Sequence, residues 1–475
     1  MVQAKKWYDA AVFFRAGVIF YMLFTVLCAG LPFWGDQVTL VSIPAQWLYA
    51  HPGNWILPEG SDTGHPPFYG LIVALAWLLA GKNLLVAHLV TLLTVLLLFT
   101  QYYLLCKRYV PEHIRWLAVL LFLFQPVILA QTAAMSPDLF LSALFLMGLE
   151  GLASGREKKL YAALLLMPLF NLRGWMLDIA LILLLFLHTK TSMRTILTAG
   201  LMLLPACCWL VYHHAQAGWW LAPAQGYWSH GRSLNDLPGI AAKAAEYIVR
   251  NVAFGMFVPW ICILFHFLRK KPVGNVLLAR SIWVVFLVLI FFLLPFRNPI
   301  LVRYLLPLML PVLLFFSGEI LAPYTFTQAR RIGLLMILLF LSYHFWAYPR
   351  SNYSLLTNDW GNGSLAHLSI FKLEEQMQDS LAVHDIPIQD VYAAFPEYKD
   401  RSDMYLVKSD AAYRPFSPDR SVSICGYFLY SNVMNGLPDS TVHALFHWTP
   451  VIKLHAYPVD LILYQNPAIQ IEQFP

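Results

Sequence analysis

Charged side chains are scarce in this chain of 475 residues. Lys, Arg, Asp and Glu make up 12% of the sequence, about half of the share found in a soluble domain, whereas apolar residues make up 59%. We therefore expect a polytopic membrane protein. The net charge of +6 needs no nucleic-acid partner, because the cytoplasmic loops of membrane proteins favour Lys and Arg.

Cysteine pairs with the spacing of metal ligands and internal repeats are also lacking, and we expect no cleavable leader. The polar C-terminal region holds only one of the six cysteines, Cys425, so it cannot contain an internal disulfide. No two cysteines have the spacing of metal ligands, and there is no internal repeat or low-complexity tract. The first apolar run, residues 11–33, is longer than the core of a signal peptide and lacks a clear cleavage site before Trp34, so we expect it to remain as an anchor.

Long apolar runs predict about eleven membrane helices. They lie at residues 11–33, 84–105, 116–131, 139–153, 160–172, 174–188, 195–214, 251–268, 281–296, 301–321 and 332–348. Residues 68–80 are also apolar, but counting them as a crossing would move Lys107 and Arg108 outside and invert every later loop. We therefore predict a helix at the outer interface there, a cytoplasmic N-terminus and a periplasmic or extracellular C-terminus.

Three of the predicted membrane helices are short, with about 13–15 residues where a bilayer core needs about 20. Such helices end within the bilayer, thin it or border a water-filled hollow. Polar residues mark their outer ends, so we expect a cavity open to the outside. These residues are Asp138, Arg173 and Asp178.

A change of composition near residue 350 predicts two domains. Residues 1–349 would form the transmembrane domain, with a first outer loop at 34–83 that contains the interfacial helix 68–80. Residues 350–475 regain polar residues and prolines and would form a small α+β domain outside the membrane. One helix and three strands are predicted there, at Leu373–Val383, Asp390–Ala394, Ser421–Leu429 and Leu461–Tyr464.

Charged side chains at membrane depth on the outer face are the functional candidates, because such charges are costly there. They are Asp36, Asp138, Asp178, Arg173, Arg297 and Arg303. The planar guanidinium group matches the oxygens of a phosphate. An acid beside such groups suggests a reaction in which phosphate leaves, the acid takes the proton of the attacking group, and the arginines stabilise the phosphate.

Most of these residues also have a structural explanation, and Arg297 could extend to the lipid head groups. Asp36 could be a solvated loop residue, and His65 could be a loop histidine without a task. Asp138 could cap the helix that starts near Leu139. Arg173 and Asp178 could form an ion pair, although a spacing of five residues is poor for one.

Several short motifs follow one another across residues 7–321 and favour a functional interpretation of these residues. They are Trp34-Gly35-Asp36-Gln37, Gly64-His65-Pro66-Pro67-Phe68-Tyr69, Met135-Ser136-Pro137-Asp138, Phe170-Asn171-Leu172-Arg173-Gly174 and Arg303-Tyr304-Leu305-Leu306-Pro307 with a further proline at Pro311. Together they resemble the GT-C glycosyltransferases, in the branch of protein O-mannosyltransferases and lipid A aminoarabinose transferases. The C-terminal domain lies outside this resemblance.

The resemblance implies an inverting enzyme that moves one sugar from a polyprenyl-phosphate donor to an acceptor on the outer face. In it Asp36 matches the acid that activates the acceptor. His65, Arg173 and Arg303 match positions at the donor phosphate, with His65 where lysine is common, so its contact would depend on protonation. The cavity would further hold Asp138 as the second acid, together with Asp178, Gln37 and Tyr304; a Glu is common at the position of Gln37.

A divalent metal is left open. Asp36, Asp138 and His65 could hold Mg²⁺ or Mn²⁺, but their spacing does not select a metal, and the resemblance requires none.

The expected partners are the polyprenyl-phosphate-linked sugar, a lipid, glycan or protein acceptor, and membrane lipids. A bacterial inner membrane is the expected location. The alternatives are a transporter or flippase for a lipid-linked sugar, or a membrane scaffold that binds a partner through its C-terminal domain. A transporter is less favoured, because transporters often have two similar halves with charges at the midplane, whereas these charges gather toward the outer face.

Overall fold

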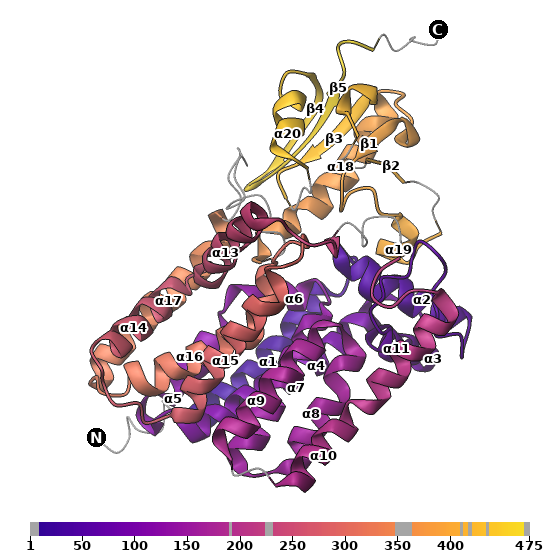
Figure 1. Ribbon diagram of the computed structural model, residues 1–475. Coiled ribbons are helices and arrows are strands. Elements are labelled where there is room, and N and C mark those ends of the chain that lie inside the picture. Colours follow the sequence, from indigo (N-terminus) through magenta and orange to yellow (C-terminus); the bar gives the residue numbers. More distant parts are fainter. Residues whose placement is uncertain are drawn as a thin grey trace.

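The computed structural model describes residues 9–189, 192–223, 231–346, 363–408, 412–416, 420–433 and 437–469. Most of the chain is a bundle of packed helices, and a small domain with a β-sheet lies at one end of it (Figure 1). The bundle end that faces this domain carries the segment after the first helix, the region that the sequence marked as functional.

The helices of the bundle follow the apolar runs. The first half holds α1 (Ala10–Cys28), the π-helix η2 (Val38–Ser42), α2 (Ile43–Ala50), α3 (Phe68–Ala80), α4 (Leu84–Tyr109), α5 (Glu112–Leu123), α6 (Pro126–Ala133), α7 (Pro137–Ser154), α8 (Glu157–Phe170) and α9 (Arg173–His188). The second half holds α10 (Met193–Met202), α11 (Leu204–Ala217), α13 (Leu237–Val252), α14 (Phe257–Leu268), α15 (Val276–Leu293), the 3-10 helix η3 (Val302–Leu305), α16 (Leu306–Phe315), the π-helix η4 (Phe316–Ile320) and α17 (Phe326–Trp346).

Length and composition allow seven of the described spans to cross a membrane, or up to nine when each of two bent helix pairs counts as one. The bent pairs are α5 with α6, at 45°, and α13 with α14, at 101°. The sequence prediction of about eleven also counted α8 and α9, which form but have only 14 and 16 residues. The predicted class, an α-helical polytopic membrane protein, is confirmed.

Two local expectations differ from the structure. The predicted run 116–131 is broken, because Pro126 cannot donate a backbone hydrogen bond and the Gln125 side chain instead accepts one from the Ile128 N–H at 2.9 Å. The start of the predicted outer loop is helical rather than irregular, since η2 and α2 fill residues 38–50. A short buried helix is hard to separate from an apolar loop by periodicity alone.

The C-terminal part is a small mixed α+β domain. Its elements are η5 (Leu365–Leu368), α18 (Ser369–Val383), η6 (Ile388–Asp390), β1 (Val391–Ala393), α19 (Arg401–Tyr405), β2 (Arg414–Pro415), η7 (Val422–Ile424), β3 (Tyr427–Ser431), α20 (Asp439–Leu445), β4 (Thr449–Ala456) and β5 (Val459–Gln465). The sheet order is β2-β1-β3-β5-β4, with β1 parallel to both neighbours and the other pairs antiparallel. Sequence analysis missed β2 and β4.

The predicted domain boundary between residues 349 and 350 falls outside the described residues and stays a prediction. The position of α3 relative to a membrane also stays a prediction. The structure does show how the bundle and the C-terminal domain are in contact. Trp34, fully buried after α1, stacks on His367 of η5 with ring centroids 5.3 Å apart.

Close packing of α8 on α9 fixes the start of α9. The helices meet at Gly174, where an added Cβ would lie 2.0 Å from the Met167 carbonyl oxygen and 2.7 Å from the Pro168 nitrogen. Both of these atoms belong to the backbone, so they cannot rotate away. The absent side chain at Gly174 therefore sets where the neighbouring Arg173 lies.

We predict that Gly174→Ala destabilises the bundle by about 1–3 kcal/mol or more, as overpacking of a close contact does. Gly200→Ala is the matched control, because it adds the same methyl within α10, where nothing lies within 4 Å of the new atom. Thermal unfolding of both variants in detergent checks this. Equal midpoints for the two variants would show that the contact at Gly174 is not tight.

Candidate functional site

A buried arginine joins two aspartates from distant parts of the chain. Arg303 lies in η3, and only 2% of it is exposed. Its guanidinium forms an ion pair with the Asp36 carboxylate, and its Nε lies 2.9 Å from Oδ2 of Asp138. Asp36 follows α1 and Asp138 is the second residue of α7, so one side chain of η3 connects three parts of the bundle.

A second arginine completes the cluster. Arg173, the first residue of α9, forms an ion pair with Asp138, and its guanidinium lies 3.6 Å from the ring centroid of Tyr304. Asp138 does not cap its own helix, because α7 begins at Pro137 and Ser136 is the N-cap residue. Two arginines and two aspartates thus form an electrically balanced group, which we call the Arg–Asp cluster: Asp36, Asp138, Arg173 and Arg303.

The cluster retains free hydrogen-bonding capacity. Asp36 is 8% exposed, and one of its carboxylate oxygens, Oδ1, has no hydrogen-bond donor among the described residues. The buried Nε of Arg173 likewise has no acceptor within the described part of the chain. A small pocket lies against the cluster and is lined by Asp138, Arg173, Arg303 and Tyr304, but not by Asp36. A carboxylate oxygen and a cationic N–H without partners therefore belong to one cluster.

The remaining predicted site residues lie around this cluster. The Nδ1 of His65 accepts a hydrogen bond from the Leu172 N–H at 3.2 Å, one residue before Arg173. Burial, and then the charges of Arg232 and Arg173, hold the pKa of His65 well below its usual 6.5. The imidazole is therefore neutral at neutral pH and orients the turn before α9 rather than supplying charge.

Among the described residues, no hydrogen bond or ion pair joins Gln37 or Asp178 to the cluster. Gln37 is the residue before η2 and is buried, with no partner for its side-chain oxygen in the described structure. Asp178 is fully buried in α9, and neither of its oxygens bonds to a described residue. The considered ion pair between Arg173 and Asp178 is therefore not formed; Arg173 binds Asp138 instead.

Sequence analysis missed a buried pair that holds the His65 loop. Asp62 accepts a hydrogen bond from the Gly64 N–H at 2.8 Å, and its Oδ2 lies 2.9 Å from Nε2 of His213 in α11. Arg232 donates to the Thr63 carbonyl at 2.5 Å. In the sequence, Asp62 stands out only as an acid inside a loop of few charges, and this does not predict His213 as its partner.

The residues considered for a metal do not fit one in this arrangement. Arg303 occupies the position between the carboxylates of Asp36 and Asp138 that a cation would need. Among the described residues, no three His, Cys, Asp or Glu side chains are grouped to hold a metal ion. A role for a divalent ion in the reaction stays a prediction.

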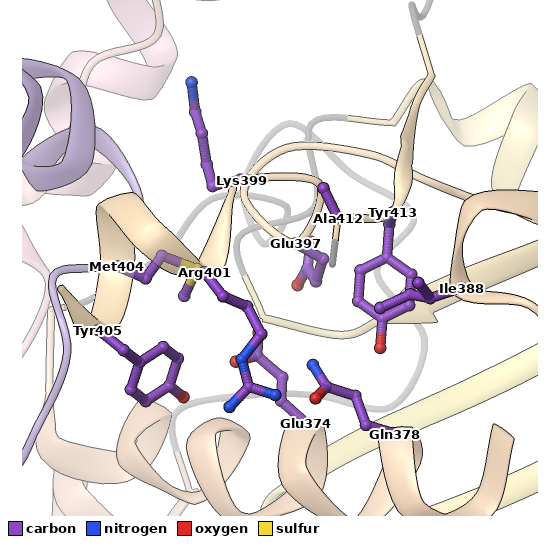
Figure 2. Close-up of a pocket in the computed structure, with 10 residues that line it drawn as sticks. All are labelled: Glu374, Gln378, Ile388, Glu397, Lys399, Arg401, Met404, Tyr405, Ala412 and Tyr413. Carbon is purple, nitrogen blue, oxygen red and sulfur yellow. The ribbon is translucent and has the colours of Figure 1, made fainter. Parts of the chain in front are cut away.

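A second polar cavity lies within the C-terminal domain. Figure 2 shows Glu374, Glu397, Arg401 and Tyr413 turned toward one small space, which they line. Burial raises the pKa of Glu374 to about 8, against the opposing charge of Arg401. Burial, and then the neighbouring Glu374, raises the pKa of Glu397 well above its usual range. Both carboxyls therefore favour the neutral form in the folded domain.

The bundle of apolar helices with the small domain at one end has the fold of a solved membrane protein, ArnT. Two of the matching structures illustrate this likeness. ArnT from Cupriavidus metallidurans in the apo state aligns over 98% of this chain and 99% of its own, with 12% identity and a TM-score of 0.55. ArnT from the same organism bound to undecaprenyl phosphate aligns over 68% of this chain and 62% of its own, with 15% identity and a TM-score of 0.51.

The fold of this chain is therefore that of the ArnT structures. No protein-family model and no curated protein sequence matches the chain. The likeness thus lies in the arrangement of helices and domain, and it extends over the C-terminal domain, which the sequence motifs did not reach.

The buried Glu374 predicts a pH dependence of stability. Its pKa is about 8 in the folded protein and about 4.3 in an unfolded chain, so the folded form binds the proton more tightly. This contribution to stability is complete below about pH 4 and is lost as the pH rises from there through about 8.

We predict that Glu374→Gln reduces the fall in unfolding temperature between pH 6 and pH 8.5. Glu375→Gln, at the exposed next position of α18, is the control and should keep the wild-type dependence. Thermal unfolding at several pH values checks this, and identical pH profiles for wild type and Glu374→Gln would contradict the assignment.

Proposed function

We propose that this chain is an inverting glycosyltransferase of a bacterial inner membrane. It would transfer a single sugar from a polyprenyl-phosphate donor to an acceptor on the outer face. The observation that carries the proposal is the contact of Asp36 and Asp138 with two buried arginines at one end of the bundle. The likeness to ArnT, one of whose structures holds undecaprenyl phosphate, supports the class of donor.

The chemistry of the proposal uses one proton and one bond exchange. The free Oδ1 of Asp36 takes the proton of the acceptor as the acceptor oxygen bonds to the anomeric carbon. The bond between that carbon and the phosphate oxygen breaks, and its electron pair stays on the phosphate. A single displacement of this kind inverts the anomeric carbon. The Nε–H of Arg173 is free to donate to the phosphate oxygen that gains charge.

Arg303 has a different task in this proposal. It is paired with both acids, so it orients the Asp36 carboxylate rather than binding substrate with its full set of donors. His65 is neutral and keeps the turn before Arg173 in place. Of the three phosphate ligands that the resemblance implied, His65 and Arg303 thus have supporting roles, and Arg173 contacts the phosphate directly.

We predict that Asp36→Asn lowers transfer by about 10²–10⁴-fold, the range that loss of a general base produces. Asn keeps an oxygen for Arg303, and Asp138 remains, so the fold should persist. Asp379→Asn, at an exposed position of α18, is the control. The assay follows radiolabelled sugar from undecaprenyl phosphate into an envelope fraction, using full-length protein in vesicles, with thermal unfolding measured in parallel.

A folded Asp36→Asn protein that transfers sugar at the wild-type rate would contradict the mechanism. Movement of intact donor across the vesicle membrane without a new glycosidic product would instead indicate the flippase alternative.

A further inference from the structure

The C-terminal domain reaches the neighbourhood of Asp36 through the segment that ends in α19. The Phe33 N–H donates to the Met404 carbonyl at 3.0 Å, three residues before Asp36. The Ser42 hydroxyl donates to the Asp403 carbonyl at 2.5 Å, six residues after Asp36. Contacts on both sides of the acid thus fix this segment against it.

A further contact secures the same seam. The Gln46 amide of α2 donates to the Asp403 carboxylate at 3.0 Å and accepts from the Lys82 ammonium at 2.7 Å. The two charged side chains of this seam, Asp403 and Lys82, are therefore both hydrogen-bonded to Gln46. Helix α19 is consequently held by side chains as well as by backbone, and Lys399 lies two residues before this helix begins.

Lys399 is a cation without an acid bound to it. It is half-buried, and its ammonium lies 5.1 Å from the ring centroid of Tyr398 and 5.9 Å from that of Phe395. No described carboxylate lies within ion-pair distance of it. Figure 2 shows its side chain pointing away from the buried carboxyls Glu374 and Glu397.

The charge that acts most strongly on Lys399 is that of Asp36. Burial lowers the pKa of the Lys399 ammonium, and the carboxylate of Asp36 is the largest charge opposing that shift, ahead of Asp403 and Asp400. The neighbouring Tyr398 also has its pKa raised, by burial and then by Asp36. Two side chains of the C-terminal domain therefore lie in the field of the proposed base.

Lys399 provides a positive charge that the Arg–Asp cluster cannot spare for a phosphate. The Arg–Asp cluster has no net charge, and Arg232 lies in the field of Asp62. A lipid phosphate entering beside Asp36 brings at least one further negative charge, which is costly to bury without a cation. Lys399 supplies that cation without breaking a pair that the bundle already uses.

We propose that Lys399 binds the phosphate group of a lipid substrate beside Asp36, so that the C-terminal domain completes the active site. The proposal rests on the proposed function for the presence of such a lipid. The phosphate is either that of the polyprenyl donor or that of a phosphorylated lipid acceptor, since an ammonium group binds both in the same way. Because an ammonium donates to phosphate as a point charge, Arg can replace it.

The first arm of the test measures binding of undecaprenyl phosphate to the full chain in nanodiscs. It compares wild type, Lys399→Met, Lys399→Arg and, as the control, Lys453→Met at an exposed position of β4. If the phosphate is the donor's, Lys399→Met weakens binding about tenfold, as loss of a hydrogen bond to a charged group does. Lys399→Arg then retains most of the affinity, and Lys453→Met binds as wild type does.

The second arm uses vesicles of phosphatidylcholine with and without phosphatidic acid, a lipid phosphomonoester. If the phosphate is an acceptor's, Lys399→Met leaves undecaprenyl phosphate binding unchanged and loses the preference for phosphatidic acid. Wild-type behaviour of Lys399→Met in both arms overturns the proposal. Transfer is assayed separately: a wild-type protein that binds through Lys399 but makes no product refutes the proposed function and leaves this site standing.

Discussion

The contact on which the site depends is the bridge that Arg303 makes between Asp36 and Asp138. Breaking such a buried pair from one side leaves an uncompensated charge and costs about 3–5 kcal/mol, so the three elements are held in one arrangement. Arg173 adds a second link to Asp138 and packs on Tyr304. Asp36, Arg173 and the contact with the C-terminal domain at α19 are all positioned relative to this bridge.

Much of the fold could be predicted from composition and hydropathy. The apolar runs predicted most of the helices, because burial in lipid or in a bundle demands such runs. Of the three predicted to be short, α8 and α9 have 14 and 16 residues, whereas α7 has 18. Breaks within runs were not predictable in the same way. The bend at Gln125 and Pro126 depends on a side-chain cap, and β4 has an irregular burial pattern that hides its alternation.

The site divides along similar lines. Asp36, Asp138, Arg173 and Arg303 stood out because charges at membrane depth are rare. Their pairing could not be predicted from the sequence. Asp178 is closer to Arg173 along the chain and lies in the same helix, but Arg173 forms its ion pair with Asp138 of another helix. Nothing in the sequence marked Lys399 as functional, because it lies in a domain without motifs. Only the tertiary contacts of Asp403 and Met404 bring its segment into the field of Asp36.

The measurement that tests the account most directly is a cryo-electron microscopy structure of the full chain in nanodiscs with undecaprenyl phosphate. The account predicts the phosphate within about 3 Å of a nitrogen of Arg173, on the side of the cluster where the free oxygen of Asp36 lies. Arg303 should remain between Asp36 and Asp138. A phosphate bound away from this cluster, with Arg303 no longer joining the two acids, would contradict it.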